Sequence, residues 1–453
     1  MSDESRPLLL RGGTVISMDT AVGDHRSADV LLSAGRIEAV GPDLGVEDAE
    51  VIDATNMVVL PGLVDAHRHL FYTSFRGSMV DMSMPDWVRE ILPRIAGRLE
   101  PDDLYASTLA GAADALNYGI TTVHDFCSAA NSGAHAASAV AALKASGIRA
   151  VFGHGSSIKS KLGEESAAEG WDSARRIRQS ELAGDGLVRL SLALLGPDQS
   201  SIDDTAFDIA VARELEIPMA MHIGGRRPLT YGVKQLRDAG LLGPDMNFSH
   251  CTGTTDEELR MLVEAGSTAT ASPSAESMMG SGTPSTGRMR DAGLRLSFGA
   301  DSVCCATGDL FQEARSALYV ERALRAIPIF AEDRPVENFG QLGLTSREVL
   351  EGITLGGAHA VWMGDDIGSL TPGKRADVIL LRKSDLNLAT GGDVAAAVVS
   401  AANGGNVDTV IVDGEVVKRH GAMVSLDLDR IRSEAVAARD RVYSLTDYPG
   451  IKP

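Results

Sequence analysis

The middle of the chain repeats one pattern: a short apolar run, then a longer segment that in several places carries helix-start signals. Alternating strands and helices predict a parallel α/β architecture, because parallel strands need a long crossover between them. Eight such runs favour a closed (β/α)8 TIM barrel, and a doubly wound open sheet is the alternative. The runs cover residues 63–67, 120–126, 148–154, 188–196, 217–223, 246–251, 267–273 and 294–301.

Both chain ends are rich in predicted strands. Gly12-Gly13, Gly35 and Asp413-Gly414 supply turn positions between apolar runs at these ends. We therefore predict three parts: a small composite β-sandwich domain built from both ends, a metal-dependent barrel, and a C-terminal helical tail. Their boundaries are residues 1–60 with 366–425 for the sandwich, 61–365 for the barrel, and 426–453 for the tail.

Helix starts are marked in two places by capping-box spacing, in which a Ser or Thr is followed three residues later by Glu or Gln. Thr254 with Glu257 and Thr345 with Glu348 have this spacing. We expect a helix to begin at each.

Composition excludes several classes of partner. The 453 residues carry a formal net charge of −20, whereas nucleic-acid binding usually leaves a basic surface. No run approaches the roughly 18 apolar residues that a membrane helix needs, and the N-terminus lacks the features of a secretory signal. The four cysteines form no C-x-x-C pair. We expect a cytoplasmic protein with a small-molecule substrate and neither a membrane nor a nucleic-acid partner.

Polar residues that bind metals stand at the ends of four predicted strands. His67 and His69 end the first, His222 the fifth, His250 the sixth and Asp301 the eighth. A single H-x-H pair is weak evidence, and one histidine alone is more often a hydrogen-bonded core residue. Strand ends of a barrel meet at one rim, however, so five such residues predict a shared metal site. Imidazole and carboxylate ligands together suit Zn²⁺ or a similar divalent ion.

The same segments carry a family resemblance that spans nearly the whole chain. The sequence resembles the amidohydrolase superfamily, in the branch of triazine hydrolases and of cytosine, guanine and S-adenosylhomocysteine deaminases. The resemblance implies a barrel with a composite β-sandwich, and a homodimer or other homo-oligomer. Its motifs are PGLVDAHRH (61–69), GITTV (119–123), SHC (249–251), FGAD (298–301) and IGSLTPGKRADVILL (367–381).

The resemblance also assigns roles to the strand-end residues. It places the metal ligands at His67, His69, His222 and Asp301, with Asp301 as the catalytic base and His250 as the catalytic histidine that contacts the attacking water or the substrate. Binuclear members bridge two ions with a lysine on the fourth strand, and residues 188–196 contain no lysine. A single zinc ion, or another divalent ion in its place, is therefore expected.

One departure from the family puts ordinary deamination in doubt. Deaminases of this branch carry H-x-x-E on the fifth strand, and here Gly225 stands at the Glu position. Glu276 is the one nearby acid that we name as a substitute, and a solvated loop position is its alternative. Arg226 and Arg227 follow the glycines and suit a carboxylated substrate, with a helix-start or surface role equally open.

Three further residues are expected at the pocket: His124 at the end of the second strand, and Phe75 and Trp87 in the loop after the first. Hydrogen bonding within the barrel, or core packing, would explain them as well.

The sequence thus predicts an enzyme that hydrolyses non-peptide C–N bonds of a small carboxylated or heteroaromatic substrate with one metal ion. A second hypothesis is a cyclase that closes a benzoxazole-type ring on an aminophenol carboxylate, as in actinomycete natural-product biosynthesis. A third is a metal-free binding scaffold. Bound metal separates the third from the others, and the reaction product separates the first two.

Overall fold

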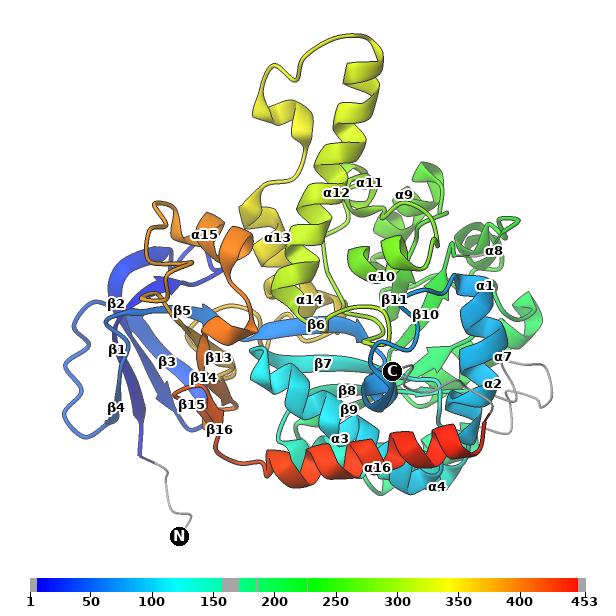
Figure 1. The fold of residues 1–453 in the computed structure, drawn as a ribbon, viewed down its shortest axis with the longest axis horizontal. Helices are drawn as coiled ribbons and strands as arrows, with labels where there is room; N and C mark the ends of the chain where they lie inside the picture. The colour runs from blue at the N-terminus through cyan, green and yellow to red at the C-terminus, as the bar shows by residue number, and fades with distance from the viewer. Residues whose placement is uncertain (1–5, 157–170, 185, 226, 447–453) are drawn as a thin grey trace.

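Seven parallel strands form the wall of a barrel in a computed structural model of the chain, which describes residues 6–156, 171–184, 186–225 and 227–446 (Figure 1). The strands follow one another in sequence order around the wall. Each pairs in parallel with the next, so all seven carboxyl ends lie on the same rim. The strands are β6 (Leu63–Arg68), β7 (Ile120–Cys127), β8 (Arg149–Gly155), β9 (Val188–Leu194), β10 (Met219–Ile223), β11 (Met246–His250) and β12 (Thr268–Thr270).

The predicted eighth strand, 294–301, closes the barrel without forming a regular strand. It makes isolated parallel bridges, one between Phe298 and Ala271 beside β12 and one between Asp301 and Arg68 on β6. The N–H of Ala66 donates to the carbonyl of Phe298 at 3.0 Å, which joins this segment to β6. The barrel is therefore confirmed and the open sheet was wrong. Asp301, the last residue of the segment, has a φ of 56°, outside the strand region.

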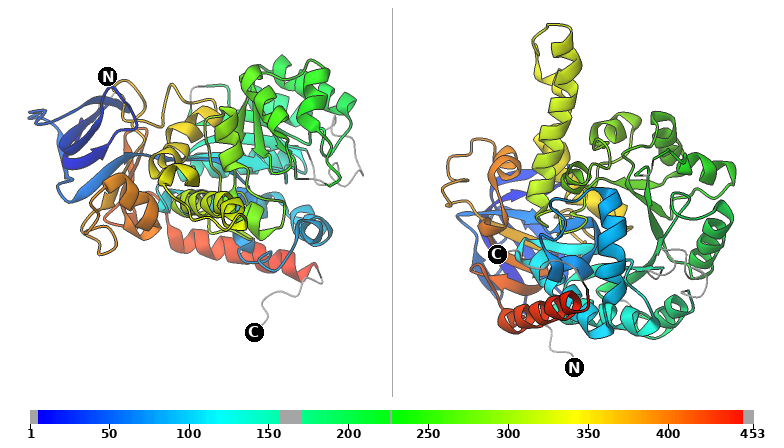
Figure 2. Two further views of the ribbon diagram at one scale, coloured as in Figure 1. Left: turned by 90° about the horizontal axis from the view of Figure 1, so that it is seen from above. Right: turned by 45° about the vertical axis from the view of Figure 1, so that its right-hand side comes forward.

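Helices between the strands cover the outside of the barrel (Figure 2). The capping box predicted at Thr345 and Glu348 is confirmed at the start of α13. The one predicted at Thr254 was wrong by one residue, since α9 starts with a capping box of Thr255 and Glu258. The longest helix, α12, projects away from the barrel in both figures. The main helices are α3 (Pro101–Asn117), α4 (Gly133–Ser146), α6 (Trp171–Gln179), α7 (Ile202–Glu214), α8 (Gly232–Asp238), α9 (Asp256–Ala265), α10 (Pro273–Met278), α11 (Thr286–Ala292), α12 (Leu310–Ala331), α13 (Ser346–Gly352) and α14 (Leu355–Ala360).

Strands from both chain ends form a second sheet, as predicted, although hydrogen bonds join them into one mixed sheet of nine strands. Its two halves meet where β13 pairs antiparallel with β5. Asp413-Gly414 forms the predicted turn between β14 and β15. Gly12-Gly13 is not a turn but a register shift inside β1, beside β2. The strands are β1 (Leu8–Ile16), β2 (Asp24–Ser33), β3 (Arg36–Gly41), β4 (Glu50–Asp53), β5 (Met57–Pro61), β13 (Val378–Arg382), β14 (Val407–Val412), β15 (Glu415–Arg419) and β16 (Ala422–Met423).

A single residue and a buried ion pair join this sheet to the barrel. Only Gly62 separates β5 from β6, and a side chain there would overlap Thr121. Arg149 on β8 binds Asp377 with two hydrogen bonds, from Nε to Oδ2 at 2.8 Å and from Nη2 to Oδ1 at 2.9 Å. Both side chains are at most 4% exposed. A bidentate pair fixes the orientation as well as the distance of the two elements.

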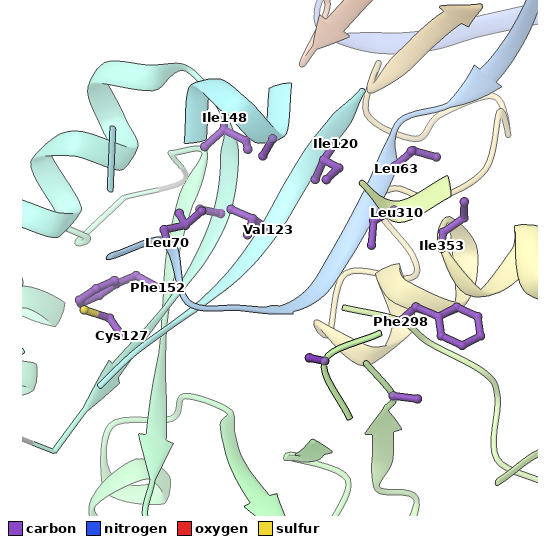
Figure 3. Packing of buried hydrophobic residues seen from close by; sticks show 14 of the residues in the cluster. Leu63, Leu70, Ile120, Val123, Cys127, Ile148, Phe152, Phe298, Leu310 and Ile353 are labelled. Atoms are coloured by element: carbon purple, nitrogen blue, oxygen red, sulfur yellow. The ribbon is translucent and has the colours of Figure 1, made fainter. Parts of the chain in front are cut away.

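Apolar side chains between the strands and the covering helices form one large core (Figure 3). Leu63 and Ile120 lie on neighbouring barrel strands, Phe298 on the closing segment and Leu310 at the start of α12, and all are buried. The core therefore links the segment that carries Asp301 to the strands that carry the histidines. The nine-stranded sheet has a smaller core of its own.

The C-terminal part forms helix α16 (Leu428–Ser444), which packs along α3 and includes most of the tail's described residues (Figure 1). Arg441 pairs with Asp103 of α3, and Ile431 is buried against Leu109 and Ala113. Among the described residues no helix is long and apolar enough to cross a membrane.

Candidate metal centre and pocket

The five predicted strand-end residues lie together at the carboxyl rim of the barrel. Nε2 of His67 is 3.6 Å from Oδ1 of Asp301, and Nε2 of His69 is 3.3 Å from the same oxygen. His250 Nε2 is 4.0 Å from Oδ2 of Asp301. The ring of His222 stacks between those of His69 and His250, at centroid distances of 5.4 and 5.3 Å. Four imidazoles and one carboxylate thus converge on one small volume.

Hydrogen bonds outside this cluster orient the imidazoles. His69 Nδ1 donates to the carbonyl oxygen of Phe126 at 2.7 Å, which leaves Nε2 as the nitrogen that faces Asp301. His67 Nδ1 is 3.0 Å from Oγ of Ser249, so its Nε2 also faces inward. Ligand histidines in metalloproteins are commonly held by such a bond at the second ring nitrogen.

The backbone at two of these residues is strained in a way that aims the side chains. His250 has a φ of 76° and Asp301 a φ of 56°, in the left-handed region that side chains other than glycine seldom occupy. The hydroxyl of Ser285 donates to the carbonyl of His250 at 3.0 Å. The N–H of Asp301 donates to the carbonyl of His67 at 2.9 Å. Neighbouring elements therefore hold a conformation that local preference disfavours, as is common at functional sites.

The electrostatics of the cluster favour an ionised Asp301. Burial opposes ionisation, yet the hydrogen bond from His67 and the charges of the nearby histidines hold the pKa of Asp301 below its usual range. Burial opposes charge on His250 too, but the hydrogen bond from His250 to Glu276 raises the pKa of His250. Asp301 is thus an ionised carboxylate that accepts a hydrogen bond from one of the surrounding imidazoles.

These donors fit a divalent metal ion. Two sets, His67 with His222 and His250, and His67 with His69 and Asp301, each hold their ligand atoms within 4.8 Å of one another. Nitrogen ligands with a carboxylate oxygen are the set that zinc and similar ions prefer. Strand β9 carries no lysine, so the described strand offers no bridge to a second ion.

A pocket opens above the cluster, with apolar and polar residues in its lining. The apolar lining comes mainly from the loop after β6, and the polar lining from the metal-site residues and from the loop after β9. The lining residues are His69, Tyr72, Met79, Met84, Trp87, Val88, Leu92, Asp198, Gln199, His222, Gly225, His250, Met279, Asp301 and Ser302.

The structure brings some of the other predicted site residues to this pocket and not others. Trp87 lines it. Phe75 is fully buried in the core and does not. His124 lies below the rim, where its Nε2 contacts Oγ of Ser191 at 3.0 Å, and burial lowers the pKa of His124 to about 3. This is the hydrogen-bonded alternative foreseen for His124.

Glu276 lies next to the cluster, whereas Arg227 lies at the surface. Glu276 is 1% exposed and accepts a hydrogen bond from Nδ1 of His250 at 3.2 Å, so it is not a solvated loop acid. Arg227 is exposed and donates to the carbonyl of Gly224 at 3.1 Å. Arg226 lies outside the described residues.

Sequence reasoning missed Asp198 and Gln199, which line the pocket from the loop after β9. The available signal was their place in GPDQS, directly after a predicted strand. The segment contains no histidine, so it lacks the metal-ligand pattern of the other strand ends.

Comparison with known proteins identifies the family. The model of the amidohydrolase family matches residues 58–417, more than half of the chain. The chain belongs to the amidohydrolase family. The match covers the barrel and reaches into the sheet strands on both sides of it, as the fold requires.

Curated relatives of this amidohydrolase match over nearly its whole length. A 5′-deoxyadenosine deaminase of Methanosarcina mazei is 26% identical and covers 96% of this chain and 98% of its own. A 5-methylthioadenosine/S-adenosylhomocysteine deaminase of Desulforudis audaxviator is 29% identical and covers 94% and 97%.

Solved structures agree in fold. An adenosine deaminase from Xanthomonas campestris with bound zinc superimposes with a TM-score of 0.84 at 23% identity, over 96% of this chain and 98% of the other. An atrazine chlorohydrolase from Arthrobacter aurescens in complex with zinc gives 0.83 at 23% identity, over 95% and 100%. These matches support the barrel with its added sheet.

Proposed function

We propose that this amidohydrolase hydrolyses a non-peptide C–N bond of a small heteroaromatic substrate with the help of one zinc ion. The observation that carries the proposal is the convergence of His67, His69, His222 and Asp301 on one volume at the base of a largely apolar pocket. The relatives named as deaminases, which match along nearly their whole length, support C–N chemistry.

The zinc assignment rests on the donors and on the relatives. His67, His69, His222 and Asp301 would hold the ion, and zinc-bound structures share the fold. When bound, such an ion supplies an activated water and polarises the carbon under attack. Because β9 has no lysine to bridge a second ion, we propose a single one.

Asp301 and His250 are the residues that we assign to proton movement. Asp301 directs Oδ1 toward His67 and His69 and Oδ2 toward His250. An ionised carboxylate in this place accepts the proton of the attacking water. His250, held from behind by Glu276, donates a hydrogen bond to the substrate or to that water.

Gly225 determines which C–N bond we expect to be cleaved. Glycine carries no proton, so a reaction that needs a second carboxylate at this position is disfavoured. We therefore propose a substrate whose leaving group is protonated through Asp301 and His250. Benzoxazole-type cyclisation would use the same metal site, but no described contact favours it over hydrolysis.

The test is an assay of the zinc-loaded protein with an aminopurine, an aminotriazine and an aryl amide, followed by mass spectrometry in ¹⁸O-water. Hydrolysis inserts one labelled oxygen into the product. The expected result is labelled product with about one zinc per chain, and none from His67→Ala. A protein that binds no metal, or a fused ring in place of labelled product, would overturn the proposal.

The role of Gly225 has its own experiment. Among the described residues other than its chain neighbours, no heavy atom lies within 4 Å of a Cβ built at Gly225, so the first atom of a side chain has room there. We expect Gly225→Glu to gain aminopurine deamination relative to the parent. Unchanged rates for every amine would show that the missing Glu does not limit the chemistry.

A further inference from the structure

Helix α12 and the segment that returns from it form an arm that projects from the barrel (Figure 2). We define the arm as residues 319–342, which include the outer half of α12 and the short helix η5 (Phe339–Leu342). Arg325 pairs with Glu321 on the same helix and with Asp291 on α11. These ion pairs tie the arm to the helices around the barrel, so the fold sets its direction.

The arm exposes apolar side chains in a stripe along α12. Tyr319, Ile327 and Phe330 are 58%, 61% and 62% exposed, and Ala323 between them is exposed as well. Their spacing of four, four and three residues places them on one side of a helix. Single exposed apolar residues are ordinary on a protein surface, whereas a continuous row of them marks a surface that binds another molecule.

The sizes of the side chains in this stripe fit a second copy of the same stripe. If two α12 helices pair antiparallel about their Arg325 positions, Ala323 of one copy faces Ile327 of the other, and Tyr319 faces Ala331. Each large side chain then meets a small one, as close packing between two helices requires. A two-fold contact is isologous, so each of these pairs forms twice.

Charges at the two ends of the stripe also complement one another in this arrangement. At the inner end, Arg315 and Arg322 donate hydrogen bonds to neutral oxygens, and neither forms an ion pair with another described residue. At the outer end, Asp333 and Glu337 are exposed and likewise have no ion pair within the described part of the chain. Antiparallel arms bring the outer end of each copy to the inner end of the other, so opposite charges meet there.

We propose that the arm is the homodimer interface of this protein, and that the two α12 helices pack antiparallel about a two-fold axis near Arg325. Residues 319–342 supply about the 20–30 residues that each side of a stable interface contributes. None of the described residues that line the pocket belongs to the arm, so this inference does not depend on the proposed function.

Sedimentation velocity of the full-length protein at micromolar concentration tests the proposal. We expect a species of twice the 47.6 kDa of the chain. Ile327→Asp and Phe330→Asp each put a charge into the stripe and should weaken the dimer by about 30-fold or more, as changes at interface hot spots do. Phe207→Asp on α7 is the matched control. Phe207 is 49% exposed but lies outside the arm, so the dimer should be unchanged in this variant.

Charge reversals test the direction of the two helices. Arg322→Glu should weaken the dimer, because it brings like charges together across the two-fold axis. Adding Asp333→Arg and Glu337→Arg to the same chain should restore the dimer, since opposite charges then meet again. A triple variant that stays as weak as Arg322→Glu would refute the antiparallel arrangement.

Two results would overturn the interface itself. One is a monomer at every concentration measured, which would leave the stripe to a different partner. The other is a dimer whose dissociation constant is the same in the parent and in both stripe variants, since its contact would then lie elsewhere. Melting temperatures of all variants check that each is folded.

Discussion

The molecule buries charged groups in two places, at the catalytic rim and at the joint between the barrel and the nine-stranded sheet. At the joint, Arg149 and Asp377 satisfy each other with two short hydrogen bonds, and the N–H of Asp413 donates to Asp377 at 2.8 Å. At the rim, four imidazoles crowd one carboxylate, and two of the residues have positive φ values. The joint is complete within the chain, whereas the rim has the donors of a site that receives an ion.

We therefore expect the joint to contribute to stability and the rim to contribute to function. The rim holds side chains in positions that local backbone preference disfavours, which is useful for chemistry and costs stability. The joint has a pairing that holds two elements together. Substitutions at the two places should therefore change different measured quantities.

The largest expected effect is on catalysis at the rim. Asp301→Asn keeps the shape of the side chain and removes its charge, so we expect kcat/KM to fall by about 10³-fold or more with little change in melting temperature of the metal-free protein. His67→Ala should also reduce the zinc content measured by elemental analysis. Activity of Asp301→Asn close to that of the parent would remove Asp301 from the mechanism.

The largest expected effect on stability is at the joint. Arg149→Met leaves Asp377 buried without its partner and should lower the free energy of unfolding by about 3–5 kcal/mol in chemical denaturation. The double variant Arg149→Met/Asp377→Leu should recover part of this loss, because the buried carboxylate of Asp377 is removed as well, while the partly exposed Asp413 still loses its bond from Arg149. A loss of activity in Arg149→Met without a loss of stability would contradict the comparison.

A smaller effect concerns pH, through an acid buried near the rim. Glu313 on α12 accepts the N–H of Ser274 at 3.0 Å, and burial raises its pKa from 4.5 to about 8. The folded protein therefore keeps a proton that the unfolded chain loses, and the stability contributed by this group falls as the pH rises from about 4.5 to about 8. Melting curves from pH 5 to 8 should show a shallower decline in Glu313→Gln than in the parent.

The smallest effect compares two adjacent glycines at the rim. Gly224→Ala should cost more than about 1 kcal/mol of unfolding free energy, since its φ is 76° and its Cβ would crowd Thr254. Gly225→Ala should cost little, because the space there is open. Denaturation midpoints measure both. If both variants lose the same unfolding free energy, the backbone of this loop adjusts to the added side chain. The rim would then be less rigid than the joint.

Much of the fold was predictable because each strand has a local signature. Seven of the eight predicted barrel strands form regular strands at nearly the predicted residues. The predicted start of α9 was one residue early, because Thr254–Glu257 and Thr255–Glu258 have the same spacing. Only the structure shows that the hydroxyl of Thr255 accepts the backbone N–H. Gly12-Gly13 lies at a register shift inside β1, and a side chain at Gly13 would lie 2.6 Å from Val59 on a neighbouring strand, so the close approach of the strands requires a glycine there.

The sequence by itself determined the candidate metal ligands and the rim on which they meet, because histidines at the carboxyl ends of parallel strands converge once a barrel closes. Only the tertiary structure decided which other groups reach that rim. Asp198 lines the pocket because the loop after β9 contacts the loop after β10. Glu276 reaches His250 because α10 packs next to the end of β11. Contacts of this kind join segments far apart in the chain, so no local pattern encodes them.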